Sequence, residues 1–189
     1  MSKCNTNNFL TYGFDKNSNY QIINVKKNIK HSVFDLKIKS LGNKILTIKN
    51  IRVNLIGDHN ISNATASVAI ALNLGIKINK IKRALKKFLG IQRRFTKVLS
   101  LEKREFYDDY AHHPTEIRAV INSARQVHRD RKIICVFQPH RYSRVKFLKN
   151  EFALSFKESD AVVLCPVYSA GEKIRYNFDQ KKFSQLIAK

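Results

Sequence analysis

The sequence predicts an α/β protein in two parts. Apolar and polar residues alternate through most of residues 20–56, which is the pattern of antiparallel strands with one solvated face. Two segments of helical periodicity follow. From residue 96 onward, short apolar runs alternate with helical segments, as in the βαβ units of a parallel, doubly wound sheet. The organisation changes at GIQRRF, residues 90–95, so we expect one part over residues 1–91 and another over 92–189.

The first part is expected to begin with an antiparallel meander. Its strands are predicted at residues 20–25, 32–39, 44–48 and 51–56, with a hairpin turn at LGNK, residues 41–44. A helix follows, in which Ile61, Thr65, Val68 and Leu72 share one face and Gly75 provides the C-terminal cap. A second helix is predicted from about residue 79, with Ile81, Leu85 and Phe88 facing inward.

The second part is expected to open with two short strands in residues 96–108. A helix over residues 114–127 then begins at Pro114, which is favoured in a first helical turn. Residues 132–137 and 161–165 have the continuous apolar character of strands that are buried on both faces. Between them we predict one helix over residues 144–157, with Val145, Leu148, Phe152 and Phe156 inward, and a last helix near residues 179–188.

Composition narrows the functional classes. The 189 residues are 43% hydrophobic, which is enough for a real core, and no apolar run is long enough to span a bilayer. The polar N-terminus has no signal-peptide character, so we expect a cytoplasmic protein without a membrane partner. The net charge of +22 suggests nucleic acid, but the lysines are spread along the chain, and we do not expect specific nucleic-acid binding. The three cysteines are far apart and indicate neither disulfides nor a metal site.

Polar clusters follow three of the strands predicted in the second part. Ligands bind open parallel sheets beyond the carboxyl ends of the strands. The clusters lie at residues 108–113, 138–144 and 168–172, and they therefore predict a shared pocket.

Some residues in these clusters allow two interpretations. Arg141 and Arg144 are three residues apart and could hold one anion between them, or could simply cap a helix at the surface. His112 and His113 are not expected to bind a metal, because adjacent side chains point to different faces and no third ligand has suitable spacing. In the first part, Asn60 and Asn63 could read the edge of a base or could cap the helix.

Five motifs together resemble the bacterial Mur ligases, and within that family the members that join L-alanine to UDP-N-acetylmuramate. The similarity extends over nearly the whole chain and keeps the family's motif order. The motifs are GDHNISN at residues 57–63, RRF at 93–95, DDYAHHPTE at 108–116, FQPHRYSR at 137–144 and VYSAGE at 167–172.

The resemblance implies a partial central ATPase domain, of strands plus two helices, followed by a Rossmann-like C-terminal domain that is incomplete at its end. It implies transfer of the ATP γ-phosphate to the muramate carboxylate and attack on the acyl phosphate by the amine of L-alanine. The implied ATP contacts are Asn60 and Asn63 on adenine, Asp109 on ribose and Arg94 on the phosphates. The residues implied to position L-alanine are Tyr110, His112, His140, Arg141 and Arg144.

The sequence contains no GxxxxGK[ST] phosphate loop. By resemblance the cofactors are ATP and Mg²⁺, but the magnesium ligands, a complete catalytic set and the UDP-sugar domain are not expected in this chain. We therefore expect a ligase fragment, from a split, truncated or frameshifted gene, that is inactive alone and active only if the missing part is supplied in trans. A separately encoded N-terminal portion of the ligase is one such partner. The alternatives are a non-catalytic module that binds a nucleotide or an amino acid, and a basic nucleic-acid-binding protein.

Overall fold

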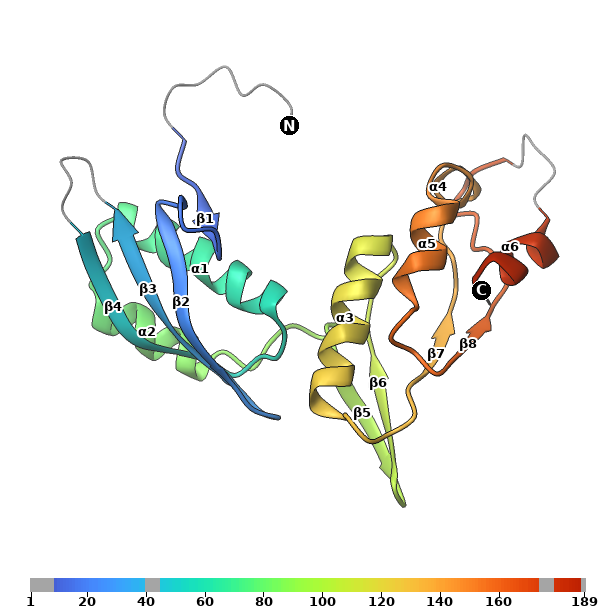
Figure 1. The fold of residues 1–189 in the computed structure, drawn as a ribbon, viewed down its shortest axis with the longest axis horizontal. Coiled ribbons are helices and arrows are strands. Elements are labelled where there is room, and N and C mark those ends of the chain that lie inside the picture. The colour runs from blue at the N-terminus through green and yellow to red at the C-terminus, as the bar shows by residue number, and fades with distance from the viewer. Residues whose placement is uncertain (1–8, 40–44, 174–178, 188–189) are drawn as a thin grey trace. The chain divides into compact units, whose positions relative to one another are not determined.

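The protein forms two compact units, residues 1–90 and 91–189, which we describe separately (Figure 1). The structure is a computed structural model and describes residues 9–39, 45–173 and 179–187. The expected hairpin turn at residues 41–44 and Cys4 lie outside these ranges. Within them, no helix is long and apolar enough to cross a membrane.

The first unit contains a four-stranded sheet in the order β1-β2-β3-β4. The short strand β1, Tyr12–Gly13, runs parallel to β2, Tyr20–Lys27. Strand β3, Ser32–Lys39, is antiparallel to both β2 and β4, Ile45–Val53. The antiparallel meander predicted from the alternating pattern is therefore confirmed.

Strand β4 replaces the two strands that we expected at residues 44–48 and 51–56. The chain does not turn between them, because the polar residues around Asn50 form a β-bulge within a single strand. The register shifts between Phe34 and Leu36 of β3, and Asn50 in β4 has a φ of 56°. The backbone N–H of Asn50 donates to Oδ1 of Asp35 at 2.8 Å, which holds the bulge in place.

Helices α1, Asp58–Asn73, and α2, Ile78–Lys87, pack against this sheet and close its core (Figure 1). Ile61, Thr65 and Val68 are buried on α1, as predicted. On α2, Ile81 is buried and Leu85 packs against the core, but the prediction for Phe88 is wrong, since its side chain is 45% exposed. Phe88 lies beyond the last helical residue, where the backbone is already extended and no longer follows the helical period.

The second unit opens with the antiparallel hairpin of β5, Thr96–Leu101, and β6, Arg104–Asp108. Helix α3, Pro114–Val127, has the predicted bounds. Strands β7, Ile134–Phe137, and β8, Ala161–Leu164, pair in parallel, and the chain between them is helical, which makes a βαβ unit. Helix α6, Gln180–Ile187, follows. The α/β class predicted for the chain is confirmed.

The single helix expected over residues 144–157 is two helices, α4, Tyr142–Phe147, and α5, Lys149–Ser155. Leu148 interrupts them with a φ of −116° and a ψ of 22°. The core side is nevertheless as predicted. Val145, Phe152 and Phe156 are buried, and Leu148 packs against them.

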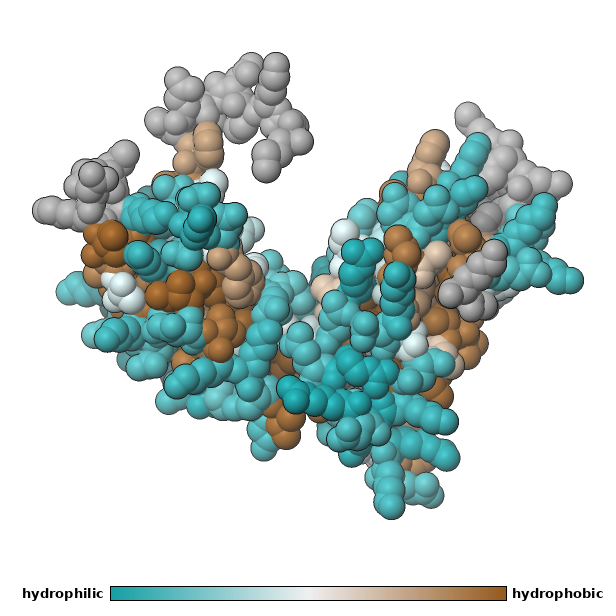
Figure 2. All heavy atoms as spheres, viewed as in Figure 1, coloured by the Kyte–Doolittle hydropathy of each residue, from teal (hydrophilic) through white to brown (hydrophobic). Residues whose placement is uncertain are grey.

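Strands β7 and β8 are buried on one face only, so the prediction of burial on both faces is wrong. Cys135, Phe137, Val162 and Leu164 pack with side chains from α3, α4, α5 and α6. The alternating residues Ile134, Val136 and Val163 are 64%, 72% and 52% exposed. Hydrophobic residues are visible at the surface in this region (Figure 2). The free thiols of Cys135 and Cys165 are partly buried.

Phe152→Ala should destabilise the second unit by about 3–5 kcal/mol, because it removes a fully buried ring and leaves a cavity. The Phe152 ring lies 5.6 Å from that of Phe137 and 6.0 Å from that of Phe183, between centroids. Urea denaturation combined with hydrogen exchange of the α5 amides measures the loss. Phe147→Ala is the control, since Phe147 is 76% exposed, and it should change the unfolding free energy by less than about 0.5 kcal/mol. Equal effects of the two substitutions would contradict this core assignment.

Candidate functional site

The three polar loops that follow β6, β7 and β8 meet, although β6 pairs with β5 in an antiparallel sheet and not with the parallel β7–β8 pair. The ring of His140 contributes the central contacts. Its centroid is 6.1 Å from that of Tyr110, 5.7 Å from that of His112 and 5.2 Å from that of Tyr168. The two histidine rings are stacked at an interplanar angle of 29°. The sequence predicted this convergence of loops but gave Tyr168 no individual role.

Backbone hydrogen bonds lock the loops after β7 and β8 together. The N–H of Tyr168 donates to the carbonyl of Pro139 at 2.8 Å, and the N–H of Arg141 donates to the carbonyl of Tyr168 at 2.8 Å. These bonds form an isolated parallel bridge between His140 and Tyr168. The β7–β8 pairing is thus resumed beyond the strand ends, which fixes where the His140 ring sits.

Asp109 organises the loop after β6. Its Oδ2 accepts the N–H of Phe95 at 2.7 Å, and its Oδ1 accepts the N–H of Ala111 at 2.7 Å. The N–H of Tyr110 donates to the carbonyl of Arg93 at 2.9 Å. Asp109 therefore holds two stretches of backbone together. Its contact with an ATP ribose stays a prediction.

Glu116 closes the same loop onto α3. Its Oε2 accepts the N–H groups of His112 at 3.1 Å and His113 at 3.2 Å. In return Nδ1 of His113 accepts the N–H of Thr115 at 3.3 Å, which completes a capping box. Partial burial raises the pKa of the Glu116 carboxyl, but these hydrogen bonds and the charge of Arg94 outweigh that effect and hold it below its usual value. Arg94, which the resemblance assigns to ATP phosphates, has Nη1 3.7 Å from Glu116 Oε1.

Arg93 belongs to the site, although the sequence alone predicts no role for it. Its guanidinium carbon lies 4.9 Å from the centroid of the Tyr110 ring, in a cation–π arrangement. Its Nε is 3.4 Å from Oδ2 of Asp108. The signal available in the sequence was the RRF motif. That motif indicates an arginine near the loop after β6, but it does not predict that the guanidinium lies over the ring of Tyr110.

Burial lowers the pKa of His140 below its ordinary value, and the nearby charges of His112, Arg144 and Arg93 lower it further. His140 is therefore neutral at pH 7. Nδ1 of His112 lies 2.8 Å from the carbonyl oxygen of Tyr110. In the part of the chain that the structure describes, no group of three or more His, Cys, Asp or Glu side chains could hold a metal ion.

Arg141 and Arg144 occupy the start of α4. Arg141 is the N-cap residue, with an exposed side chain that makes no capping hydrogen bond. Arg144 is partly buried in the first turn. The interpretation of these two arginines as side-chain caps is not supported, because the carboxylate of Glu172 takes that place by accepting the N–H of Ser143 at 3.1 Å.

Asn60 and Asn63 lie one turn apart on α1 in the first unit. The N-cap of this helix is Gly57, with a φ of 95°, so capping by either asparagine is wrong. Nδ2 of Asn60 donates to the carbonyl of Ile56 at 2.8 Å, whereas Asn63 is exposed. Adenine binding by this pair stays a prediction.

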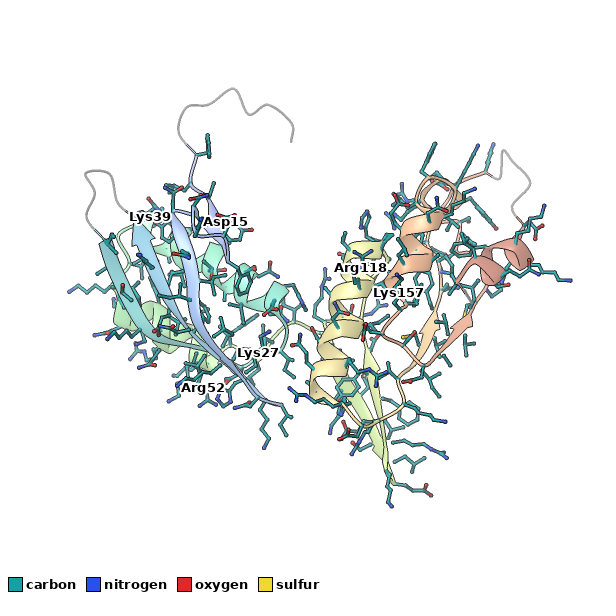
Figure 3. All side chains as sticks on the ribbon, in the orientation of Figure 1. Asp15, Lys27, Lys39, Arg52, Arg118 and Lys157 are labelled. Atoms are coloured by element: carbon teal, nitrogen blue, oxygen red, sulfur yellow. The ribbon has the colours of Figure 1, made fainter. Side chains whose placement is uncertain are left out.

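An ion pair ties the start of α1 to the sheet. Nζ of Lys27, which lies at the end of β2 (Figure 3), is 2.6 Å from Oδ1 of Asp58, in the first turn of the helix. This contact joins the first turn of α1, which carries Asn60, to the end of β2.

The fold and the strand-end loops are those of an ATP-dependent ligase family. The chain belongs to the Mur ligase family: the Mur ligase middle domain matches residues 1–71, and the Mur ligase glutamate ligase domain matches residues 93–188. It is a homologue of UDP-N-acetylmuramate–L-alanine ligases. It is 50% identical over 189 residues to that enzyme from Pelagibacter ubique, and 40% identical over 172 residues to that from Brucella anthropi.

The chain is shorter than these relatives. All of it aligns with the Pelagibacter protein but spans 41% of that protein's length, and it spans 36% of the Brucella anthropi protein. Among solved structures, the UDP-N-acetylmuramate–alanine ligase from Thermotoga maritima is similar, with a TM-score of 0.70 and 27% sequence identity. The match covers 95% of this chain and 37% of the Thermotoga chain. Folylpolyglutamate synthase from Mycobacterium tuberculosis shares the fold at a TM-score of 0.65 and 15% identity.

The low pKa of His140 predicts a pH dependence of stability. Below about pH 6.5 the unfolded chain binds a proton at this residue, whereas the folded chain binds it only at a lower pH. The free energy of unfolding should therefore fall as the pH drops from about 6.5 to the folded pKa, and His140→Asn should flatten that slope. Titration of the His140 ring by NMR checks the cause. A midpoint at or above about 6.5 would contradict it.

Asp109→Asn should cost about 1–3 kcal/mol of stability, because the amide cannot accept both backbone N–H groups. Asp108→Asn is the matched control. Asp108 meets Arg93 in an ion pair, and its side chain is 45% exposed, so its loss should cost less than about 1 kcal/mol. Urea denaturation compares the two variants, and equal losses would remove the clamping role of Asp109.

Proposed function

We propose that this chain is the L-alanine-binding portion, with part of the ATP site, of an enzyme that joins L-alanine to UDP-N-acetylmuramate through an acyl phosphate. The observation that supports it most is the cluster of His112 and His140 at the strand ends, with Arg141 and Arg144 beside it. These residues lie in a chain that aligns over its whole length with such ligases. The isolated chain is proposed to be inactive. Because the complete ligase is proposed to use ATP, which is made and kept in the cytoplasm, we propose that the reaction takes place there.

The chemistry of the cluster suits an amino acid. The guanidinium groups of Arg141 and Arg144 offer forked donors that match a carboxylate. A neutral His140 can accept a hydrogen bond from the ammonium group, which a protonated imidazole cannot. Catalysis of this kind depends on positioning an amine against an acyl phosphate and on stabilising charge.

The nucleotide side of the proposal rests on fewer contacts. Asn60 and Asn63 would hold adenine, Asp109 the ribose and Arg94 the phosphates, with Mg²⁺ bound by residues outside this chain. A non-catalytic module that binds L-alanine or a nucleotide is the second candidate, because the sequence lacks the phosphate loop that holds ATP.

The test joins this chain to the portion of the Pelagibacter relative that it does not match. We expect no L-alanine-dependent ATP hydrolysis by the chain alone with UDP-N-acetylmuramate, and clear turnover by the fusion. Arg141→Ala and Arg144→Ala in the fusion should each raise the KM for L-alanine by about tenfold or more, since a charged hydrogen bond contributes about 1.5–3 kcal/mol.

Arg118→Ala is the control for these arginine variants. Arg118 is exposed on α3 of the same unit (Figure 3), so its loss should leave the KM for L-alanine unchanged. Turnover by the chain alone would contradict the fragment assignment. L-Alanine binding without turnover in the fusion would favour the non-catalytic module. An unchanged KM in both the Arg141 and the Arg144 variant would remove their assigned role.

A further inference from the structure

Glu172 makes a two-point contact with the start of α4 from the loop after β8. Its Oε2 accepts the N–H of Ser143 at 3.1 Å, and its Oε1 accepts the hydroxyl of Ser143 at 2.5 Å. These hydrogen bonds hold the pKa of the Glu172 carboxyl below its usual value, and the charge of Arg141 lowers it further. Glu172 is therefore ionised at neutral pH, and the sequence alone predicts no role for it.

The turn before Glu172 is built to present it. Ala170 and Gly171 both have positive φ, 49° and 83°, and the N–H of Glu172 donates to the carbonyl of Ser169 at 3.0 Å. Two successive residues in the left-handed region reverse the chain sharply. The turn brings a carboxylate back to Ser143, in the first turn of α4, 29 residues earlier in the chain.

The residue next to this contact is strained. Arg141 has a φ of 65° and a ψ of 125°, a combination that side-chain-bearing residues rarely adopt and that costs on the order of 1–3 kcal/mol. Such a conformation persists only where its surroundings hold it. Here the N–H of Arg141 donates to Tyr168, and Glu172 fixes Ser143 two residues later.

We propose that Glu172 is a positioning residue for the amino-acid site. It fixes the first turn of α4 and thereby the direction in which Arg141 and Arg144 present their guanidinium groups, without touching the substrate. This inference rests on the proposed role of both arginines in binding the L-alanine carboxylate. The competing possibility is that Glu172 stabilises α4 and does nothing for the ligand. The two differ in what happens to the KM for L-alanine.

The kinetic test uses the active fusion. Glu172→Gln should raise the KM for L-alanine by about tenfold, equivalent to about 1.4 kcal/mol, with kcat and the KM for ATP within about twofold of the parent. Ser143→Thr keeps the hydroxyl and should stay close to the parent. If Glu172 acts through Arg141, adding Glu172→Gln to Arg141→Ala should raise the KM little further. An unchanged KM for L-alanine, or an equal rise in both KM values, would overturn the proposal.

A second measurement does not depend on activity. In the isolated chain, Glu172→Gln should accelerate hydrogen exchange of the Ser143 amide by about tenfold. Asp179→Asn is the matched control, because Asp179 caps α6 by accepting the N–H of Lys182 at 3.0 Å and lies outside the strand-end loops. Unchanged exchange at Ser143 would overturn the proposal, as would faster exchange with an unchanged KM. If the parent fusion itself shows no L-alanine-dependent turnover, the proposed function fails, whereas the exchange rates still decide whether Glu172 fixes this segment.

Discussion

The candidate site depends on the hydrogen bonds that continue the β7–β8 pairing beyond the strand ends. The N–H of Tyr168 donates to the carbonyl of Pro139, and the N–H of Arg141 donates to the carbonyl of Tyr168, so these bonds join the two loops along one edge. Loops are usually the mobile parts of a domain, and a site built on them needs such support. Without these bonds His140 would not be held between Tyr110 and Tyr168.

Three carboxylates around the strand-end loops of the second unit accept hydrogen bonds from backbone N–H groups. Asp109 holds Phe95 and Ala111, Glu116 holds the start of α3, and Glu172 holds the start of α4. For Glu116 and Glu172, these hydrogen bonds hold the pKa of the carboxyl below its usual value, so both side chains stay ionised. Burial lowers the pKa of His140, and the charges of Arg144 and Arg93 act on its ring and lower that pKa further. Their guanidinium groups suit the carboxylate of a ligand bound there.

Periodicity predicted the α/β class and the bounds of α3, because these depend on repeating patterns within single elements. The convergence of the three loops was predicted from the rule that parallel strands end at one edge of a sheet. What they missed depends on distant partners. The bulge at Asn50 needs Asp35, and the orientation of Asp109 needs the backbone of Phe95, 14 residues away. The open face of β7 and β8 is a further case, since an apolar run reads the same whether one face is covered or both.

The backbone of Arg141 implies a conflict between stability and ligand binding at one position. Glycine would adopt its positive φ without strain and should stabilise the isolated chain. It would also delete the guanidinium that the site is proposed to use. Selection for stability alone would therefore replace this arginine. A homologous protein that carries glycine at this position should therefore no longer bind the amino-acid substrate through this residue.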